Sequence, residues 1–582
     1  MTSTVKNKAV LLSLAERYFP IFSWLKTYNK EDFHGDAIAG VITAILLIPQ
    51  AIAYAMLAGL PPQLGLYASI LPPLAYAVFG TSRTSSVGPV SVAAIMIASA
   101  LTAPEISELG NPVESAVILA MEGGFILLLM ALLRMGGLVN FISHPVLTGF
   151  TSGAAILIIF SQLPHFLGIA KPHCGLDMSC YIDVAKQYNV MTFAVGIFSI
   201  TLLYFFSKPL VFLLKKVGIM DTLVMALSKS GPLVAVFLGT LFVSRYNLAE
   251  MSGVKIIGAV PSGLPKISLN FEISEKWHLL LPYAGFIALI AYVESVAIAK
   301  VTANMRNQRI DANQELIALG AANVATAISG GMSVAGGFSR TMVNFSAGAR
   351  TQMAMIFAVG IISLAVIFFT DWFEIIPKVT LAAIILLAIL PLVKIRNIFH
   401  TWTYDRADGV AELATFLGVL FFGIEEGLTL GIVLTIAAYL RKTSKPHIAV
   451  VGRVPNTEHY RNVERHKVQT WSNLLLVRVD ENMTFSNAGY IEDCVMAELA
   501  KQKSVEHVVF IFTSVSYIDA TALEALENLN RSFKALGIIM HLAEVKGPVM
   551  DKLERTEFIE QLKPGQVFFR VDEAVEELAG DF

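Results

Sequence analysis

Three polar or charged side chains stand out because each lies inside an apolar run of the sequence. Arg340 lies in SGGMSVAGGFSRTMVN, Glu294 is the one charge in LLLPYAGFIALIAYVESVAIA, and Gln50 is the one amide in ILLIPQAIAYAMLAGLPP. Such side chains cost free energy in apolar surroundings and are kept there mainly for binding or transport. These three residues are therefore candidates for a site that binds a charged solute.

Two short segments, SSVGPVSVAAIM at 85–96 and SGGMSVAGGFSRTMVN at 329–344, are broken by Gly or Pro near their beginning. We expect each to open a helix within the membrane, the first at 87–89 and the second at 337–339. Two such helix starts bring free N–H groups and positive dipole ends to one place. Pro89 fits the first helical position of the first helix. The predicted occupant is a small anion.

Gln50 and Tyr54 are one helical turn apart and therefore lie on one face of the first apolar segment. Together they could hold an oxyanion by hydrogen bonds. An isolated Gln in a helix bundle also often only joins two helices, and the spacing does not decide between these roles. Ser85, Ser86 and Ser91 are weaker candidates, because serine is a common helix cap.

Arg340 and Glu294 are expected to lie close together. Burial disfavours the charged form of Glu294, whereas a nearby arginine favours it, so an anion bound at Arg340 would change the proton occupancy of Glu294. This predicts proton coupling, and a sodium cage of side-chain oxygens is not expected here. Two alternatives stay open, a permanent ion pair between the two residues and an arginine that reaches the membrane interface. Glu122 and Glu412 are further intramembrane carboxylates.

The composition identifies the environment of these residues. Hydrophobic residues make up 55% and charged residues only 15% of the 582 residues, and the mean hydropathy is +0.64. Ordinary soluble chains carry about 25% charged residues, so we expect a membrane protein with the lipid bilayer as a partner. Lys and Arg number 43 against 45 Asp and Glu, a net charge of −2, which gives no reason to expect a nucleic-acid partner.

Fourteen apolar segments are expected in the membrane, at 37–58, 62–80, 86–103, 113–134, 145–168, 189–207, 230–245, 279–299, 313–330, 334–347, 351–369, 375–393, 408–424 and 427–440. An even number places both termini on the same side. The two broken segments are the third and the tenth, which are corresponding positions in two halves of seven. This arrangement is typical of a transporter with an inverted repeat and a binding site at the membrane midplane.

The loops differ in charge between the two sides of the membrane. Lys and Arg concentrate on the side of the N-terminus, whereas Glu105, Glu425 and Glu426 lie among the acids of the opposite side. By the positive-inside rule both termini are cytoplasmic. The start MTSTVKNKAVLL does not resemble a secretory signal peptide. Cys174 and Cys180 are then expected on the outer side, and whether they form a disulfide stays open.

The chain turns to soluble composition after RKTSKPH. Apolar runs then alternate with helical stretches in a βαβ rhythm, the runs at 473–479, 505–512, 537–542 and 566–570 and the helices at 487–503 and 520–536. We expect a cytoplasmic N-terminal segment at 1–36, a membrane domain at 37–440 and a cytoplasmic α/β domain at 441–582. The sequence shows no nucleophile with a positioned base, no Walker loop and no metal cluster, so neither enzyme activity nor a cofactor is expected.

Several stretches now identify a family. IPQAIAYAMLAGLPPQLGLYASILPPLAYAVFGTSRTSSVGP, YVES, IDANQELIALGAANVATAISGG and GGFSRTMVN, followed by the α/β tail, resemble the SulP (sulfate permease) anion transporters with a C-terminal STAS domain. The resemblance covers nearly the whole chain. It implies fourteen transmembrane helices in a seven-plus-seven inverted repeat, core and gate domains with an elevator movement, and a homodimer.

The resemblance also implies a set of site residues. The family's anion site falls on Gln50, Tyr54, Gly88, Pro89, Val90, Ser339 and Arg340, and Glu294 matches the acidic proton-coupling position. Some relatives have an aromatic residue after the Gly-Pro pair where this chain has Val90, which leaves the lining of the site and the substrate preference open. In the tail, Thr521 matches the position at which free-standing STAS proteins carry a phosphorylated Ser or Thr. Alternatively, Thr521 only lies in the first turn of a helix capped by Asp519.

The leading hypothesis is proton-coupled sulfate uptake by an elevator mechanism across the inner (plasma) membrane. Transport of bicarbonate, chloride or dicarboxylates, or anion exchange, stays open because one scaffold can serve several substrates. A more distant alternative is a membrane anchor for a STAS signalling scaffold. Gln50, Glu294 and Arg340 argue against a mere anchor, in which their cost would have no purpose.

Overall fold

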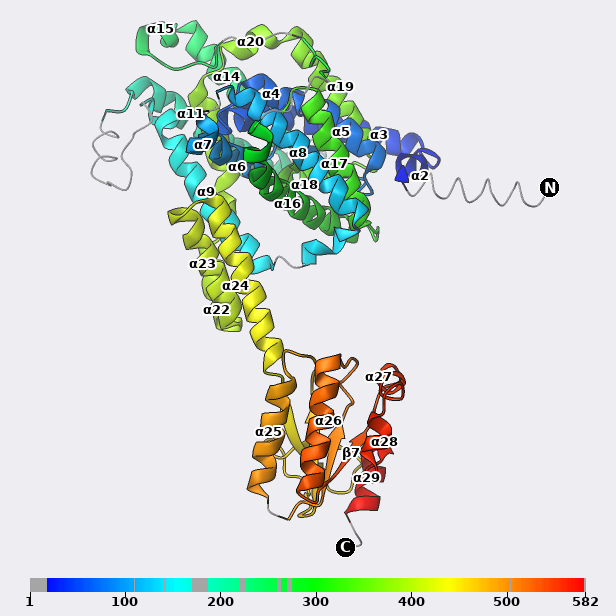
Figure 1. The fold of residues 1–582 in the computed structure, drawn as a ribbon. Coiled ribbons are helices and arrows are strands. Elements are labelled where there is room, and N and C mark those ends of the chain that lie inside the picture. Colours follow the sequence, from blue (N-terminus) through cyan, green and yellow to red (C-terminus); the bar gives the residue numbers. More distant parts are fainter. Residues whose placement is uncertain are drawn as a thin grey trace, which may run out of the picture. The chain divides into compact units, whose positions relative to one another are not determined.

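The computed structural model describes residues 18–108, 110–140, 143–169, 187–218, 224, 227–258, 263–268, 275–502 and 504–579. The chain divides into two compact units, residues 1–433 and 434–582, which are coloured blue to yellow and yellow to red (Figure 1). The expectation about Cys174 and Cys180 falls outside the described residues.

The larger unit is helical. Its first half holds α2 (Ile21–Leu25), α3 (Lys30–Leu57), α4 (Pro62–Tyr67), α5 (Leu71–Phe79), β1 (Val87–Gly88), α6 (Ser91–Thr102), α7 (Pro104–Ser107), α8 (Pro112–Leu132), the 3-10 helix η1 (Met135–Asn140), α9 (His144–Leu167), α11 (Val190–Ser207), α12 (Pro209–Lys216), α14 (Gly231–Arg245) and α15 (Leu248–Ser252). Its second half holds α16 (Glu275–Asn304), α17 (Ala312–Ile328), β2 (Ala335–Gly336), α18 (Phe338–Ser346), α19 (Met353–Phe368), α20 (Thr370–Glu374), α21 (Lys378–Ile389), η2 (Leu390–Leu392), α22 (Ile395–Tyr404) and α23 (Arg406–Phe421), and α24 (Ile424–Ser444) follows.

Each of the fourteen predicted segments contains at least one helix, and the segment 62–80 contains two, α4 and α5. Six helical stretches in the described part of the chain are long and apolar enough to cross a membrane. Three shorter apolar helices, α6, α14 and α19, accompany them. The helical membrane architecture is therefore confirmed, whereas the number of fourteen crossings stays a prediction.

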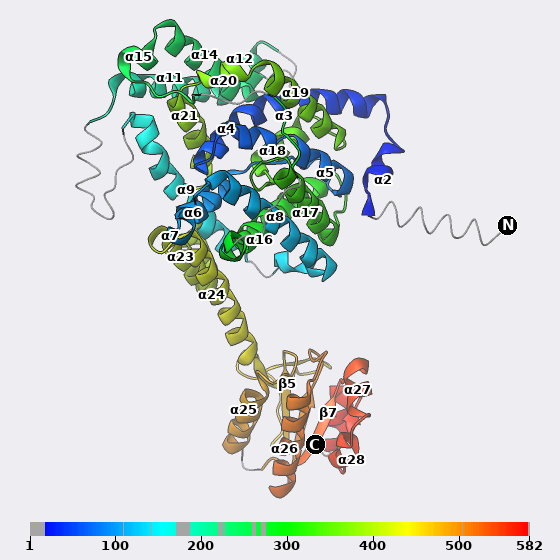
Figure 2. The same ribbon diagram turned by 45° about the horizontal axis from the view of Figure 1, so that its top comes forward.

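The helices of the larger unit form two groups. In the first group α17 packs against α8 and α5, α3 against α19 and α18, and α16 against α8 and α6. In the second group α9 packs against α23 and α21, and α11 against α21 and α14. The blue N-terminal helices α3 to α8 lie among the green helices α16 to α19 in both views (Figures 1 and 2). These groups correspond to the expected core and gate domains.

Small residues allow the core helices to approach closely. A Cβ atom added at Gly124 of α8 would lie 3.0 Å from the carbonyl oxygen of Gly320 of α17, and one added at Gly320 would lie 3.0 Å from the carbonyl oxygen of Gly124. Close backbone contact between small residues is the usual way in which membrane helices associate.

Helix α3 starts with a capping box in which Asn29 and Asp32 satisfy each other's backbone N–H groups.

Two short strands interrupt the helical core. β1 and β2 pair antiparallel, with Val87 opposite Gly336 and Gly88 opposite Ala335. The first broken helix, α6, begins only at Ser91, so the prediction that the helix opens at 87–89 with Pro89 as its first residue is wrong. The reason is that Val87 and Gly88 pair as a strand before the helix can start. The second broken helix, α18, begins at Phe338, as predicted.

The smaller unit is an α/β domain with a six-stranded sheet. Its strands are β3 (Ile448–Arg453), β4 (Tyr460–Asn462), β5 (Leu474–Val479), β6 (His507–Ile511), β7 (Ile539–Ala543) and β8 (Val567–Phe568). Its helices are α25 (Ala488–Lys501), α26 (Ala520–Ala535), α27 (Gly547–Leu553), α28 (Phe558–Leu562) and α29 (Val571–Leu578). The strand order is β4-β3-β5-β6-β7-β8, parallel from β5 to β8, whereas β3 is antiparallel to both neighbours.

The prediction found β5 to β8, α25 and α26 but did not anticipate β3 and β4. The sheet separates two hydrophobic cores. One includes Val508 and Phe510 of β6 with Phe533 of α26, and the other includes Trp471 and Phe568 with residues of α29. A sheet with apolar residues on both faces is what parallel strands between helices require.

A buried histidine joins three neighbouring strands of this domain. His541 of β7 is only 2% exposed. Its Nδ1 atom accepts from the backbone N–H of Gln566 at 3.1 Å, and its Nε2 atom lies 3.1 Å from Nδ1 of His507 on β6. Because Nδ1 accepts, the ring proton of neutral His541 is on Nε2. Burial, with a contribution from His507, lowers the pKa of His541 from 6.5 to about 4.

This histidine predicts a loss of stability in acid. The unfolded chain takes up a proton near pH 6.5 and the folded domain only near pH 4, so the stabilising contribution is present above pH 6.5 and is lost as the pH falls toward 4. We expect a loss on the order of 2 kcal/mol across this range in urea unfolding of the segment 441–582. In His541→Asn, which keeps an acceptor but cannot titrate, the stability should fall less steeply. Parallel pH profiles for the two proteins would contradict the assignment.

Candidate functional site

The two broken helices present free backbone N–H groups where they start. α6 follows Val90 and α18 follows Gly337, and neither helix has a side-chain cap at its N-terminus. The first helical hydrogen bonds run from Ala94 N to Val90 O at 3.0 Å and from Thr341 N to Gly337 O at 2.9 Å. The N–H groups before them have no acceptor within their helix. Both positive helix ends therefore adjoin the β1–β2 pair.

Arg340 is a buried cation without a counter-ion among the described residues. It lies in the first turn of α18, as predicted, and is 2% exposed. Its Nη1 atom donates to the carbonyl oxygen of Pro89, whereas Nε and Nη2 have no hydrogen-bond partner among the described residues. A Cβ atom at Gly337 would lie 2.8 Å from Nη2 and one at Gly88 would lie 3.6 Å from it. The guanidinium thus lies beside the β1–β2 pair (residues 87–88 and 335–336), which we call the strand crossing, and a side chain at position 337 would leave it no room.

Helix α3 contributes the two residues expected from its spacing. Gln50 is 5% and Tyr54 is 7% exposed, and α3 packs against both α6 and α18. Tyr54 is close enough to Arg340 for an electrostatic interaction between the two side chains. The Oε1 atom of Gln50 is buried without a partner in the described part of the chain. The structure does not show the contact to a neighbouring helix that a purely structural Gln50 would make through this oxygen.

The remaining predicted site residues lie around the same crossing. Pro89 and Gly88 are buried within it. Val90 is 6% exposed and packs with Ala93, Ala291 and Ala335. Ser339, next to Arg340, is exposed, and its neighbour Phe338 is 64% exposed. The start of α18 therefore opens to one side of the crossing.

Glu294 lies near this site but is not paired with Arg340. No hydrogen bond or ion pair joins the two side chains among the described interactions. Glu294 is half-buried and lies one turn after Ala291 on α16, which packs against Val90. Glu294 and Arg340 therefore lie on two helices that pack against each other, and the closeness of their side chains stays a prediction. The permanent ion pair that the sequence left open is not formed among the described residues.

Sequence reasoning missed the side chains that hold the segment before β1. Glu315 of α17 is fully buried and accepts hydrogen bonds from Tyr76 Oη at 2.6 Å, Thr81 N at 2.8 Å, Thr81 Oγ1 at 2.6 Å and Ser82 N at 3.2 Å. Gln352 donates to the carbonyl oxygens of Ser82 at 2.7 Å and Ser85 at 3.0 Å. Unpaired backbone groups are not tolerated at membrane depth. Glu315 and Gln352 form hydrogen bonds with the backbone groups of residues 81–85, which are not part of a helix.

A second set of side chains holds the segment around β2. Asn323 of α17 donates to Val334 O and accepts from Val334 N, both at 3.0 Å. Thr326 donates to Met332 O at 3.0 Å. Ser295 of α16 accepts from Gly336 N at 2.7 Å. The available signal was the polar spacing of Asn323 and Thr326 in an apolar run, which periodicity alone does not distinguish from interhelical hydrogen bonding.

Ser85 and Ser86 are fully buried, and their hydroxyl groups have no partner among the described residues. The two other intramembrane carboxylates each keep a buried Oε2 atom without a partner among the described residues. Glu122 is 4% exposed, and Glu412 is fully buried and accepts from Asn397 through Oε1 at 2.9 Å. No group of three or more His, Cys, Asp or Glu side chains that could hold a metal ion occurs in the part of the chain that the structure describes.

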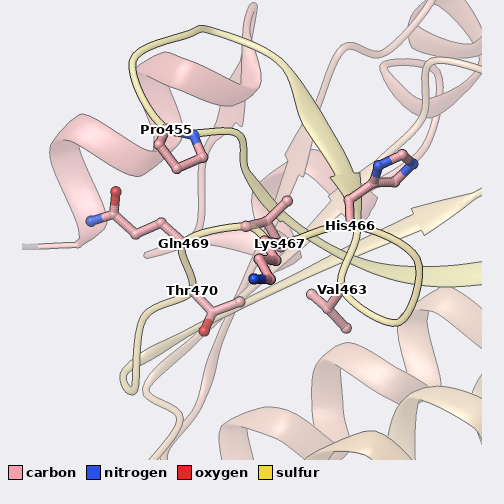
Figure 3. A pocket seen from close by; sticks show the side chains of 7 residues that line it. Pro455, Val463, His466, Lys467, Gln469 and Thr470 are labelled. Atoms are coloured by element: carbon pink, nitrogen blue, oxygen red, sulfur yellow. The ribbon is translucent and has the colours of Figure 1, made fainter.

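The smaller unit carries two further features. Thr521 is exposed in the first turn of α26, and Asp519 caps this helix by accepting from Ala522 N at 2.9 Å. An open hollow of about 690 Å³ lies beside the loop that joins β4 to β5, with Val463, His466 and Thr470 in its lining (Figure 3). Its lining side chains are exposed or half-buried, so it does not enclose a ligand.

Comparison with known proteins identifies the family. The sequence model of the sulfate permease family matches residues 33–415, and the model of the STAS domain matches residues 465–574. The probable sulfate transporter 4.2 of Arabidopsis thaliana is 33% identical over 573 residues, covering 96% of this chain and 83% of that protein. Sulfate transporter 1.3 of the same plant is 33% identical over 588 residues, with 98% and 88% covered.

Solved structures share the fold. The murine solute carrier 26 family member A9 anion transporter, solved in its inward-facing state, superposes with a TM-score of 0.86 at 20% identity, covering 98% of this chain and 95% of that one. The transmembrane domain of the cyanobacterial bicarbonate transporter BicA gives a TM-score of 0.57 at 19% identity, with 71% and 98% covered. The chain therefore belongs to the sulfate permease family and combines that family's membrane domain with a C-terminal STAS domain.

Proposed function

We propose that the protein is a secondary active inorganic-anion transporter that takes up sulfate together with protons. The observation that carries the proposal is the guanidinium of Arg340, which is 2% exposed and has two N–H-bearing nitrogens without a partner among the described residues. A buried charge of this kind is costly unless it is paired. A small anion at the strand crossing would supply the missing partner.

The donors around Arg340 suit an oxyanion. Nε and Nη2 of the guanidinium can bind two oxygens of one anion side by side, and the free N–H groups at the starts of α6 and α18 add donors from two directions. Helix α3, which carries Tyr54 and Gln50, packs against both α6 and α18, and we include the Tyr54 hydroxyl and the Gln50 amide as further donors. The plant relatives named as sulfate transporters support sulfate as the substrate.

Movement and coupling complete the proposal. The core group of helices carries every residue of the candidate site, so movement of the core against the gate would carry the anion across the membrane. Glu294, close to the crossing on α16, is the proposed proton acceptor. When it is protonated, a half-buried carboxylate no longer opposes the neighbouring anion, so proton and anion would travel together.

The arrangement in the cell is part of the same proposal. We place the protein in the inner (plasma) membrane as a homodimer, with the segment 1–36, the STAS domain and both termini in the cytoplasm. The boundaries 37–440 and 441–582 remain a prediction. Asp519 already accounts for the capping of α26, so regulation through phosphorylated Thr521 also remains a prediction.

Arg340→Ala should lower the affinity for sulfate at least about 100-fold, because the partner of the buried anion is lost. The fold should persist, since Arg340 has no ion-pair partner among the described residues and its removal therefore leaves no buried charge uncompensated. Arg340→Lys should lose about tenfold, because an ammonium group cannot bind two oxygens in parallel. The measurement is sulfate binding to the purified protein by calorimetry, with bicarbonate, chloride and succinate as competitors.

Arg350→Ala is the matched control for this experiment. Arg350 is exposed and pairs with Glu31 and Asp32 at the start of α3, and such surface pairs contribute little. Its sulfate affinity should equal that of the unmodified protein. Unchanged affinity in Arg340→Ala would refute the assignment of the site.

Glu294→Gln should uncouple transport from the proton gradient, because the amide keeps the shape of the side chain but cannot titrate. Accumulation of labelled sulfate in proteoliposomes under a pH gradient should disappear, whereas exchange of sulfate against sulfate should continue. Glu412→Gln serves as a control, since Glu412 lies in the gate group on α23. Accumulation that persists in Glu294→Gln would move the coupling role to Glu122 or Glu412.

A further inference from the structure

The proposed proton site and the proposed anion site have no direct contact. Glu294 makes no hydrogen bond or ion pair with Arg340 among the described residues. Coupled binding nevertheless requires that each event change the free energy of the other. Besides the electrostatic effect between the two charges, a packed connection between α16 and the strand crossing can carry this change of free energy.

Ser295, the residue next to Glu294, provides such a connection. It is 1% exposed. Its hydroxyl group donates to Ala291 O in its own helix at 2.5 Å and accepts from Gly336 N at 2.7 Å. Among the side-chain hydrogen bonds of the described residues, the bond from Gly336 N to Ser295 is the one that joins α16 to the β1–β2 pair.

The contact between Ser295 and Gly336 is tight as well as polar. A Cβ atom added at Gly336 would lie 3.1 Å from Cβ and 3.2 Å from Cα of Ser295. No side chain or gap separates the helix from the strand at this point. A small displacement of α16 at this residue must therefore shift the backbone of Gly336, because closely packed elements transmit strain.

A shift of Gly336 would reach the guanidinium of Arg340 through the next residue, Gly337. Gly337 follows Gly336, donates its N–H to Ser86 O at 3.0 Å and directly precedes α18 as its N-cap residue. A Cβ atom at Gly337 would lie 2.8 Å from the Cζ and Nη2 atoms of Arg340. The guanidinium therefore rests directly on the backbone that Ser295 holds. The connection consists of Glu294, Ser295, Gly336, Gly337 and Arg340.

Other charged groups on the elements around α16 do not replace this connection. They are Glu114 and Glu122 of α8, Glu105 of α7, Asp311 and Glu315 of α17 and its cap, and Arg340 of α18, with Glu275, Lys276, His278, Tyr283, Tyr292 and Lys300 on α16 itself. None of them forms a hydrogen bond or ion pair with Glu294 among the described interactions. Glu315 is already saturated by Tyr76, Thr81 and Ser82.

We propose that Ser295 is a positioning residue that transmits the protonation of Glu294 to the anion site through the Gly336 amide. The inference rests on the proposed function, in which Glu294 takes up the coupled proton. Burial costs more free energy for ionised Glu294 than for the neutral form, so in this proposal protonation changes how closely this part of α16 packs. Ser295 converts this difference into a small movement of the backbone beneath Arg340.

The test is the pH dependence of sulfate affinity in lipid nanodiscs, measured by calorimetry at pH 5.5 and pH 8. Couplings between two sites are typically 5-fold to 150-fold, and we expect the unmodified protein to bind sulfate about tenfold more tightly at pH 5.5. In Ser295→Ala this ratio should fall to about twofold or less. In Ser295→Cys the side chain stays small, but its sulfur atom is only a weak hydrogen-bond acceptor. This variant should give an intermediate ratio, and it replaces Ser295→Ala in the test if Ser295→Ala does not fold.

Thr302→Val is the matched control. Thr302 lies on the same helix, is 1% exposed, and its hydroxyl group bonds only to Ile298 O and Ala299 O of that helix. Its ratio should equal that of the unmodified protein. A merely structural role for Ser295 would weaken sulfate binding by the same factor at both pH values and leave the ratio near tenfold. That result would overturn the inference.

Glu294→Gln separates the failure of this inference from that of the proposed function. A ratio near one in Glu294→Gln together with a full ratio in Ser295→Ala would overturn the role of Ser295 and leave proton coupling through Glu294 intact. A full ratio in Glu294→Gln would overturn the proposed coupling residue, and the inference with it. An unmodified protein without pH dependence would also overturn the inference, whereas uptake driven by a pH gradient would still decide the proposed function.

Discussion

The structure of the membrane unit depends on one arrangement, in which a buried guanidinium lies beside two short paired strands, β1 and β2. Arg340 donates to Pro89 O and keeps two nitrogens without a partner in the described chain. Its position requires glycine at 337, because any Cβ atom there would collide with it. It also requires two broken helices whose N-termini meet at the same place. A free positive charge inside a membrane protein is unfavourable until an anion arrives.

The rest of the core follows from the cost of that arrangement. Non-helical backbone at membrane depth needs side-chain partners, and the long helices α16 and α17 supply them from both sides of the crossing. Glu315 anchors the first segment and Asn323 the second. Ser295 anchors β2 and sits beside the proposed proton acceptor. The same hydrogen bonds that make the broken helices possible therefore also connect the anion site to the helix that carries Glu294.

The sequence predicts this architecture where physical signals are strong. Each predicted apolar run contains a helix in the described part of the chain, and the glycines before Arg340 predicted the start of α18 correctly. The start of α6 was misplaced because Pro89 fits a first helical turn equally well as a turn after a strand, and a two-residue strand leaves no periodicity. Ser295 and Glu315 were missed because each needs partners from distant segments. The absence of an ion pair between Glu294 and Arg340 depends on side-chain geometry that spacing cannot supply.

The most direct test of the account is a crystal structure with selenate, a sulfate analogue whose selenium is located by its anomalous signal. We expect one tetrahedral anion at the crossing of β1 and β2, within hydrogen-bonding distance of Nε and Nη2 of Arg340 and of the N–H groups at the starts of α6 and α18. Selenate bound elsewhere, or an empty crossing at saturating selenate, would contradict the account.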